Sequence, residues 1–151
     1  MVRALLLLFC PHGYEPIWAQ TATSLEQVKR VFVGPFGGSA EAQEVQQALN
    51  EELRKHGKLG IADSPAESDA VLTGSGGVYV KGYYSLNPRA RSIGEDAHPV
   101  YGGYFSVELK GAQNEVLWSY LVTPHRFGRP EPIGRNLAAQ VVKKLREALP
   151  H

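Results

Sequence analysis

The sequence predicts an α/β protein of the α+β type: a two-layer sandwich in which two helices pack on one face of a mixed, mostly antiparallel sheet. Two observations support this. Two segments carry apolar residues at helical spacing, and short β-branched or aromatic runs bounded by turn residues fill most of the remaining chain. The predicted order is β-α-β-β-β-β-α. A helix with one apolar stripe must bury it against another layer, so both helices are expected to cover the sheet.

The first half of the domain begins with a strand over 28–33, which the glycine- and proline-containing segment 34–38 ends. A helix is predicted from its N-cap Ser39 to about His56, with Gly57 as the C-terminal cap. Acidic residues in its first turns and basic residues in its last favour the helix dipole. Its apolar stripe consists of Ala42, Val45, Leu49 and Leu53.

The middle of the chain is rich in strands. A short strand is predicted over 59–62 and a turn over 63–68. A third strand opens at 69–74, and we expect it to reach Val80 only through a bulge or bend at the glycines. The segment 83–99 lacks periodicity and is predicted to be a long loop.

The last third contains two strands and a helix. Strands over 101–110 and 115–123 are joined by a hairpin turn, and alternation in the first predicts one buried face. The segment 124–132 is expected to be irregular. The final helix runs from about Gly134 to Leu149, with its stripe at Leu137, Val141, Leu145 and Leu149.

The N-terminus has the pattern of a secretory signal. A basic start is followed by an apolar run over 4–10, too short to span a membrane, and by a small residue near the expected cleavage site at Ala19 or Gln20. The predicted organisation is a signal peptide over 1–20, a flexible lead-in over 21–27 and a single domain over 28–150. The alternative is a buried N-terminal strand or a misplaced start codon.

Composition narrows the class of protein. The net charge of +1 argues against nucleic-acid binding, which favours a basic excess. Cys10 is the single cysteine, and removal of the signal leaves no disulfide or cysteine-based metal site. Phe9 precedes Cys10 where a lipid-anchor signal has a small residue, so no lipid anchor is expected. The predicted location is the periplasm.

Several short motifs resemble those of a bacterial envelope group. Gly34-Pro35-Phe36 ends the first strand, Leu49–Leu53 lies in the helix, and Asp69–Gly74 and Glu115–Ser119 lie in later strands. In this order they resemble the domains related to the N-terminal domain of TolB, CsgG and LpoB. The resemblance covers about Val28 to Leu149. It implies the fold and an assembly role in the periplasm, and it transfers no partner.

No motif predicts catalysis or a cofactor. The segment 34–39 has the glycines of a phosphate-binding turn but lacks the P-loop lysine, and the glycine cluster 74–77 is neither a nucleophile elbow nor a dinucleotide fingerprint. A metal site built from His98, His125 and Asp96 is conceivable, but no histidine pair has metal-ligand spacing. We therefore expect a protein that is not an enzyme and has no cofactor.

The predicted loops carry the candidate partner-binding residues. Tyrosine and arginine are frequent in interface hot spots, and the loops hold both types. If the two loops lie at the same end of the sheet, they form one binding rim; the alternative is that their aromatic rings fold back on the core. The leading hypothesis is protein binding or self-assembly, and the alternatives are a small-ligand or cell-wall-glycan protein that uses Tyr83, Tyr84 and Tyr101 as a stacking platform, or a hydrolase. The candidates are Tyr83, Tyr84, Arg89, Arg91, His98 and Tyr101 in the first segment, and His125, Arg126, Phe127 and Arg129 in the second.

Overall fold

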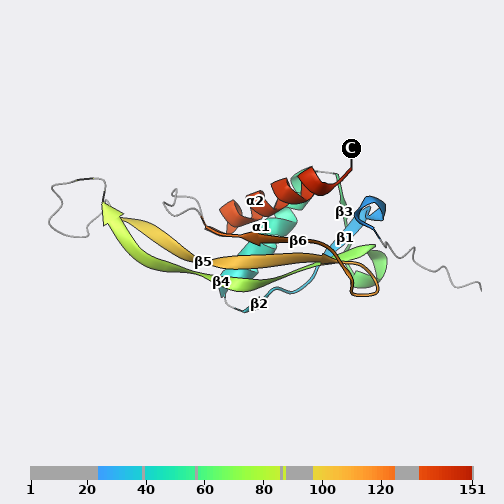
Figure 1. The fold of residues 1–151 in the computed structure, drawn as a ribbon, viewed down its shortest axis with the longest axis horizontal. Coiled ribbons are helices and arrows are strands. Elements are labelled where there is room, and N and C mark those ends of the chain that lie inside the picture. Colours follow the sequence, from blue (N-terminus) through green and yellow to red (C-terminus); the bar gives the residue numbers. More distant parts are fainter. Residues whose placement is uncertain are drawn as a thin grey trace, which may run out of the picture.

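The chain forms a sheet with two helices on one face, as a computed structural model shows (Figure 1). The structure describes residues 24–38, 40–56, 58–85, 87, 97–124 and 133–150. The predicted signal segment and the predicted caps Ser39 and Gly57 lie outside these residues. The α+β two-layer architecture predicted from the sequence is confirmed.

The first half of the described chain follows the predicted order. The lead-in ends in a 3₁₀ helix, η1 (Leu25–Gln27), and Leu25 packs against the core. Strand β1 (Arg30–Val33) follows, then the two-residue strand β2 (Gly37–Gly38) and helix α1 (Ala40–His56). The helix buries the residues of its predicted apolar stripe, together with Ala48. Each predicted boundary lies within two residues of the observed one, whereas η1 and β2 were not predicted and 25–27 was expected to be part of a flexible lead-in.

The remaining elements complete the sheet and the helical layer. They are β3 (Gly60–Ile61), the 3₁₀ helix η2 (Pro65–Glu67), β4 (Ala70–Ser85), β5 (Ala97–Lys110), β6 (Val116–Val122) and α2 (Ile133–Ala148). The predicted turn between β5 and β6 is present: the Gly111 amide donates to the Glu115 carbonyl oxygen, and Asn114 adopts a positive φ of 64°.

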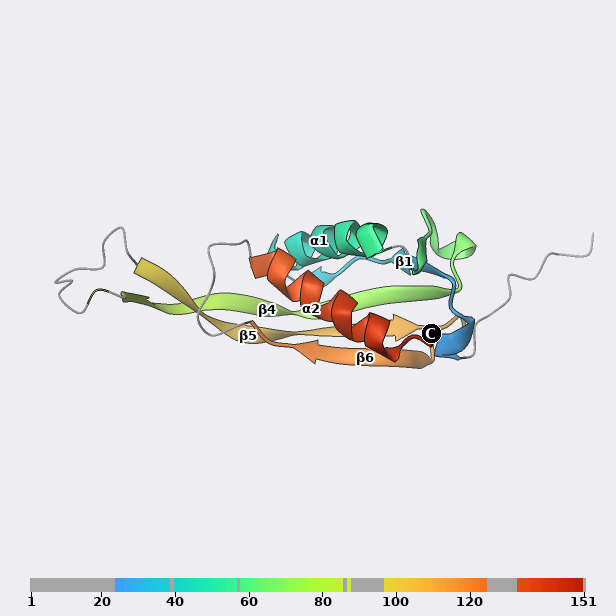
Figure 2. The same ribbon diagram turned by 90° about the horizontal axis from the view of Figure 1, so that it is seen from above.

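The sheet has the strand order β3-β1-β4-β5-β6, with β2 pairing β4 beside this path. β1 pairs β3 and β4 in parallel, whereas the long pairs β4–β5 and β5–β6 are antiparallel. Both helices lie over the same face, and they contact each other along that face (Figure 2). The opposite face of the sheet carries no described helix.

The core lies between the sheet and the helices. On β5 the predicted alternation is confirmed, since Phe105, Val107 and Leu109 are fully buried while their neighbours are partly or fully exposed. Leu137, Val141 and Leu145 of α2 are equally buried and meet this face from above. Burying each such side chain stabilises the fold by about 1.5–3 kcal/mol relative to leaving it exposed.

Two expectations for β4 and β5 are wrong. The predicted loop over 83–99 begins and ends in strand, because β4 continues to Ser85 and β5 starts at Ala97, with Tyr83 opposite Pro99. The glycine cluster 74–77 contains no bulge: the register is continuous from Val71 to Val80, and the shift falls between Val80 and Gly82.

The glycines instead provide room for side chains and backbone. A Cβ atom on Gly74 would lie 2.5–2.9 Å from the ring of Phe36, which is buried and stacks on Phe105. Gly76 has a φ of +144° and lies against the backbone of Tyr104 and Phe105. Glycine is therefore needed here for close packing, while the hydrogen-bonded register passes straight through.

Candidate binding surface

The described part of the β4–β5 hairpin extends past the rest of the sheet. β1 and β2 pair β4 only as far as Gly76, and β6 pairs β5 only from Phe105 onward. Beyond these points β4 and β5 pair only with each other among the described strands. We call residues 77–85 and 97–104 the β-arm; it projects beyond both helices (Figures 1 and 2).

The β-arm exposes four large apolar or aromatic side chains. Their exposed fractions are 61% for Tyr79, 57% for Tyr83, 56% for Tyr104 and 44% for Val80. Single exposed apolar side chains are common on protein surfaces, whereas several on one projecting element mark an interaction site. All four lie on the β-arm, which projects past both helices (Figure 2), while its base packs against the core through Val78 and Tyr101.

Tyr79 and Tyr104 lie on the sheet face that points away from the helices. Each adjoins a buried residue, Val78 or Phe105, and successive strand residues point to opposite faces. Tyr79 pairs with Gly102, and its ring crosses the partner strand, since a Cβ on that glycine would lie 3.2 Å from the tyrosine Cζ. Each tyrosine is paired with a glycine, Tyr79 with Gly102 and Tyr104 with Gly77, so no opposing side chain covers either ring.

The structure places four of the predicted binding residues in the β-arm. Tyr84 and His98 are cross-strand partners whose ring centroids lie 5.4 Å apart, with the ring planes tilted by 34°. Tyr101 is partly buried and packs against the core, which agrees with the alternative expectation that aromatic rings of the predicted loops fold back on the core. Tyr83 is exposed and adjoins Tyr84, so the two point to opposite faces and do not form one stacking platform with Tyr101.

The other predicted binding residues lie outside the described part of the chain. They are Arg89, Arg91, His125, Arg126, Phe127 and Arg129. The single binding rim that combines the two segments therefore stays a prediction.

Sequence reasoning missed Tyr79 and Tyr104. The signal was present in the pairing of tyrosine and glycine at alternate positions, Gly77 with Tyr79 on one strand and Gly102 with Tyr104 on the other. Assigning 83–99 to a loop hid it, because alternation has meaning only when both segments are recognised as one hairpin.

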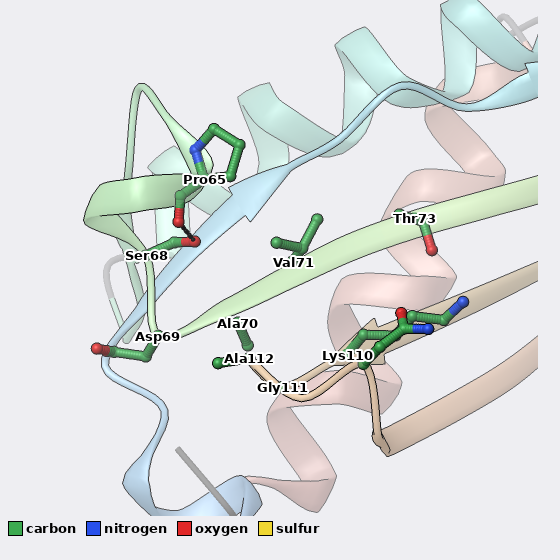
Figure 3. A pocket seen from close by; sticks show the side chains of 10 residues that line it. Pro65, Ser68, Asp69, Ala70, Val71, Thr73, Lys110, Gly111 and Ala112 are labelled. Atoms are coloured by element: carbon green, nitrogen blue, oxygen red, sulfur yellow. Dashed lines mark hydrogen bonds between the residues drawn. The ribbon is translucent and has the colours of Figure 1, made fainter. Parts of the chain in front are cut away.

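A shallow depression lies on the sheet face that points away from the helices, at the end opposite the β-arm (Figure 3). Its volume is about 440 Å³, and several of its polar groups already bind within the protein. The Asp69 carboxylate accepts hydrogen bonds from the backbone amides of Lys29 and Arg30, at 2.9 and 2.7 Å. Lys110 Nζ lies 3.1 Å from Glu108 Oε2, and Ser68 Oγ donates to the Pro65 carbonyl oxygen.

Among the described residues that line this depression, no nucleophile is hydrogen-bonded to a general base. Asp69 links the start of β4 to β1, and Lys110 forms a surface ion pair with Glu108. The lining residues are Pro65, Ser68, Asp69, Ala70, Val71, Thr73, Lys110, Gly111, Ala112 and Asn114.

The resolved pKa shifts belong to surface ion pairs on the helices. A hydrogen bond from Lys55, 2.8 Å away, lowers the pKa of Glu52, and the same kind of bond from Lys144 lowers the pKa of Glu147. On the described ranges, no group of three His, Cys, Asp or Glu side chains is arranged to hold a metal ion. No helix in the same ranges has the length and apolar character required to cross a membrane.

Known structures share this fold. A PelC dodecamer from Paraburkholderia phytofirmans is 20% identical, with 78% of this chain and 86% of that chain covered and a TM-score of 0.50. A minor lipoprotein from Acinetobacter baumannii is 12% identical, with coverages of 81% and 94% and a TM-score of 0.54. A putative neuraminyllactose-binding hemagglutinin homologue from Helicobacter pylori is 11% identical, with coverages of 83% and 84% and a TM-score of 0.50.

No protein-family model and no curated protein matches the chain. The likeness is therefore one of fold: the chain has the two-layer α+β architecture found in PelC and in a bacterial minor lipoprotein.

Proposed function

We propose that this chain is an exported bacterial envelope protein that binds another envelope protein, or further copies of itself, through the β-arm, and that it catalyses no reaction. The observation that carries the proposal is the β-arm itself, with Tyr79, Tyr83 and Tyr104 more than half exposed beyond the helical layer. An isolated two-stranded hairpin is marginally stable in water, so a long one is expected to gain stability from a partner.

Two features support export to the envelope. Residues 1–20 have the pattern of a secretory signal, and the fold is shared with a bacterial minor lipoprotein. The resemblance to the TolB, CsgG and LpoB group points the same way. In this proposal the signal is cleaved near Ala19 or Gln20 and Cys10 carries no lipid.

Aromatic chemistry supports protein binding by the β-arm. Tyrosine combines a large apolar ring with a hydroxyl, so burying it at an interface excludes water and still allows a hydrogen bond. No other described strand pairs the outer edges of the β-arm, so an extended segment of a partner can add to the sheet there. Together these provide both affinity and register.

Self-assembly is supported by the PelC structure, whose subunit has this fold and forms a dodecamer. A closed oligomer needs a surface on each subunit that contacts its neighbour. The β-arm is the most extended feature of the described chain, and it can reach across a subunit boundary without rearranging the core.

The experiment has two parts. The full chain is expressed in a bacterial host, and its mass and cell fraction are measured; a periplasmic species that starts near Gln20 or Thr21 supports export without lipid. An acylated species starting at Cys10 would instead show that the chain is exported with a lipid anchor. A full-length cytoplasmic species would overturn the export proposal.

The second part tests the surface. Replacing Tyr79 and Tyr104 together by Ser is expected to reduce the yield of cross-linked envelope complexes at least tenfold, which corresponds to about 1.4 kcal/mol or more. Lys81→Ser is the matched control, since Lys81 lies on the same arm and is exposed. Equal cross-linking by the tyrosine variant, the control and the wild-type protein would overturn the role of the arm.

A further inference from the structure

We infer that β6 is a self-pairing edge: two copies of this chain associate by antiparallel pairing of β6 with β6 about Ser119. The inference deepens the self-association that the proposed function includes, but it assigns the contact to a different strand from the β-arm. Its occupant is a second copy of the chain, and its symmetry is two-fold.

The residue order of β6 is symmetric. The strand reads Val116-Leu117-Trp118-Ser119-Tyr120-Leu121-Val122, so the same residue or residue class recurs at equal distances from Ser119. An antiparallel copy centred on that serine places valine opposite valine, leucine opposite leucine and tryptophan opposite tyrosine. A two-fold interface requires such self-complementarity.

The strand also carries no charge. Seven residues contain no Lys, Arg, Asp or Glu, no proline and no glycine. Proteins commonly protect an edge strand with a charge, a proline or a very short length, and β6 shows none of these devices. Two copies therefore meet without placing like charges opposite each other.

The two edges of the sheet differ in this respect. The strand order ends with β3 on one side and β6 on the other, and β3 contains two residues against seven in β6. No described strand pairs with the outer side of β6. One edge is thus too short to template a partner, while the other is a seven-residue strand whose outer side offers backbone donors and acceptors.

The side chains of β6 fit such a pair on both faces. Trp118 and Tyr120 lie opposite buried Leu109 and Val107 of β5, so they face the helices and stack on each other with centroids 6.1 Å apart. In the two-fold pair, each tryptophan lies opposite the tyrosine of the second copy. Ser119 and Leu121 lie on the other face, and Leu121 is 57% exposed.

The register shift between Leu109 and Lys110 interrupts the strand pattern at Leu117. In the two-fold pair Leu121 and Val122 lie opposite Leu117 and Val116, at and beyond the shift, so the regular part of the interface is Trp118 to Tyr120, with Ser119 at its centre. This keeps the central pairs of the two-fold arrangement intact.

The size of this edge predicts a reversible association. A seven-residue strand is about 24 Å long, and one sheet layer with its helix is about 20 Å thick, so each copy offers roughly 500 Å². The total of roughly 1,000 Å² is below the standard size of a stable interface, and a dissociation constant in the micromolar range is expected.

The test uses opposite charges at the centre of the pair. Ser119 is exposed and lies beside Glu108 of β5 on the face without helices. Ser119→Glu brings two carboxylates opposite each other, flanked by a Glu108 from each copy, and is expected to weaken dimerisation at least tenfold. Ser119→Lys is expected to weaken it less, because Glu108 offsets part of the repulsion.

Mixing the two variants is the decisive experiment. The Ser119→Lys and Ser119→Glu chains are expected to form a mixed dimer at least as tight as the wild-type dimer, measured by sedimentation velocity between about 1 and about 500 µM. Ser75→Glu, an exposed serine of the central strand β4, is the matched control and is expected to leave dimerisation unchanged. Circular dichroism checks that all variants fold.

A wild-type chain that stays monomeric over this range would overturn the inference, as would a mixture that associates no better than each variant alone. These outcomes leave the β-arm proposal standing if the tyrosine variants still lose envelope complexes. Conversely, restored mixed dimers with unchanged envelope complexes in the tyrosine variants would support β6 pairing and remove the role of the arm.

Discussion

Gly103, at the base of the β-arm, tolerates no side chain. Its φ is +103°, and a Cβ atom there would overlap the carbonyl oxygen of Gly77 and lie 3.1 Å from the Cα of Val78. A non-glycine residue in this conformation costs about 1–3 kcal/mol, and forcing a methyl group against fixed backbone costs about as much again. Gly103→Ala is therefore expected to destabilise the β4–β5 pairing by about 2–6 kcal/mol.

The neighbouring Gly102 provides a control for this prediction. The nearest atoms to a Cβ there belong to the Tyr79 side chain, at 3.2–3.4 Å, and a flexible side chain can move away. We expect Gly102→Ala to change the unfolding free energy by less than about 1 kcal/mol. The assay is urea unfolding together with amide exchange of the β-arm. A Gly103→Ala protein that matches the Gly102→Ala protein in both would refute the reasoning.

Two further predictions concern contacts outside the β-arm. Asp69→Ala removes the acceptor of the backbone amides at 29–30 and should lower the unfolding free energy by about 1–3 kcal/mol in urea titrations, with a smaller loss for Asp69→Asn; equal stability would contradict it. Because Lys55 lowers the pKa of Glu52 from its ordinary 4.5, this pair stabilises the fold above that pH and loses its effect as pH falls through the lowered pKa. Glu52→Gln should therefore cost at most about 0.5 kcal/mol at pH 7 and nothing at pH 2, and a cost that rises at low pH would contradict the assignment.

The helices and the core strands are readable from the sequence because burial imposes a period on them. Leu49 in α1 and Leu145 in α2 each belong to a set of apolar residues at helical spacing, because each set faces the same core. Phe105 alternates with more exposed neighbours because β5 has one covered face. Long, strongly periodic segments of this kind depend on one physical requirement, the removal of apolar area from water.

The β-arm escaped prediction because only its base, at Val78 and Tyr101, packs against the core. The rest of the arm projects past the described helices, so no apolar period is required there, and glycine and proline are tolerated. Pro99 lacks the amide that a central strand needs, yet here β5 has a described partner on one side only. The local composition then resembles a loop even though the backbone continues to pair.

Only part of the candidate site was predicted, because residue type can be seen in the sequence whereas strand register cannot. Tyr83, Tyr84 and His98 were selected by residue type, and the structure brings Tyr84 and His98 together through cross-strand pairing, while Tyr83 points to the other face. Tyr79 and Tyr104 were missed because their exposure depends on the register, which places each opposite a glycine. Register is a long-range property that the turn and both strands determine together.

The most direct test of the proposed function is site-specific photo-cross-linking in intact cells. A photoreactive side chain replaces Tyr79 on the β-arm, and in a second chain it replaces Glu51 on the exposed side of α1. The account predicts a discrete cross-linked envelope complex from the first position and none from the second. Cross-linking from α1 with none from the β-arm would contradict it, since the binding surface would then lie on the helical layer.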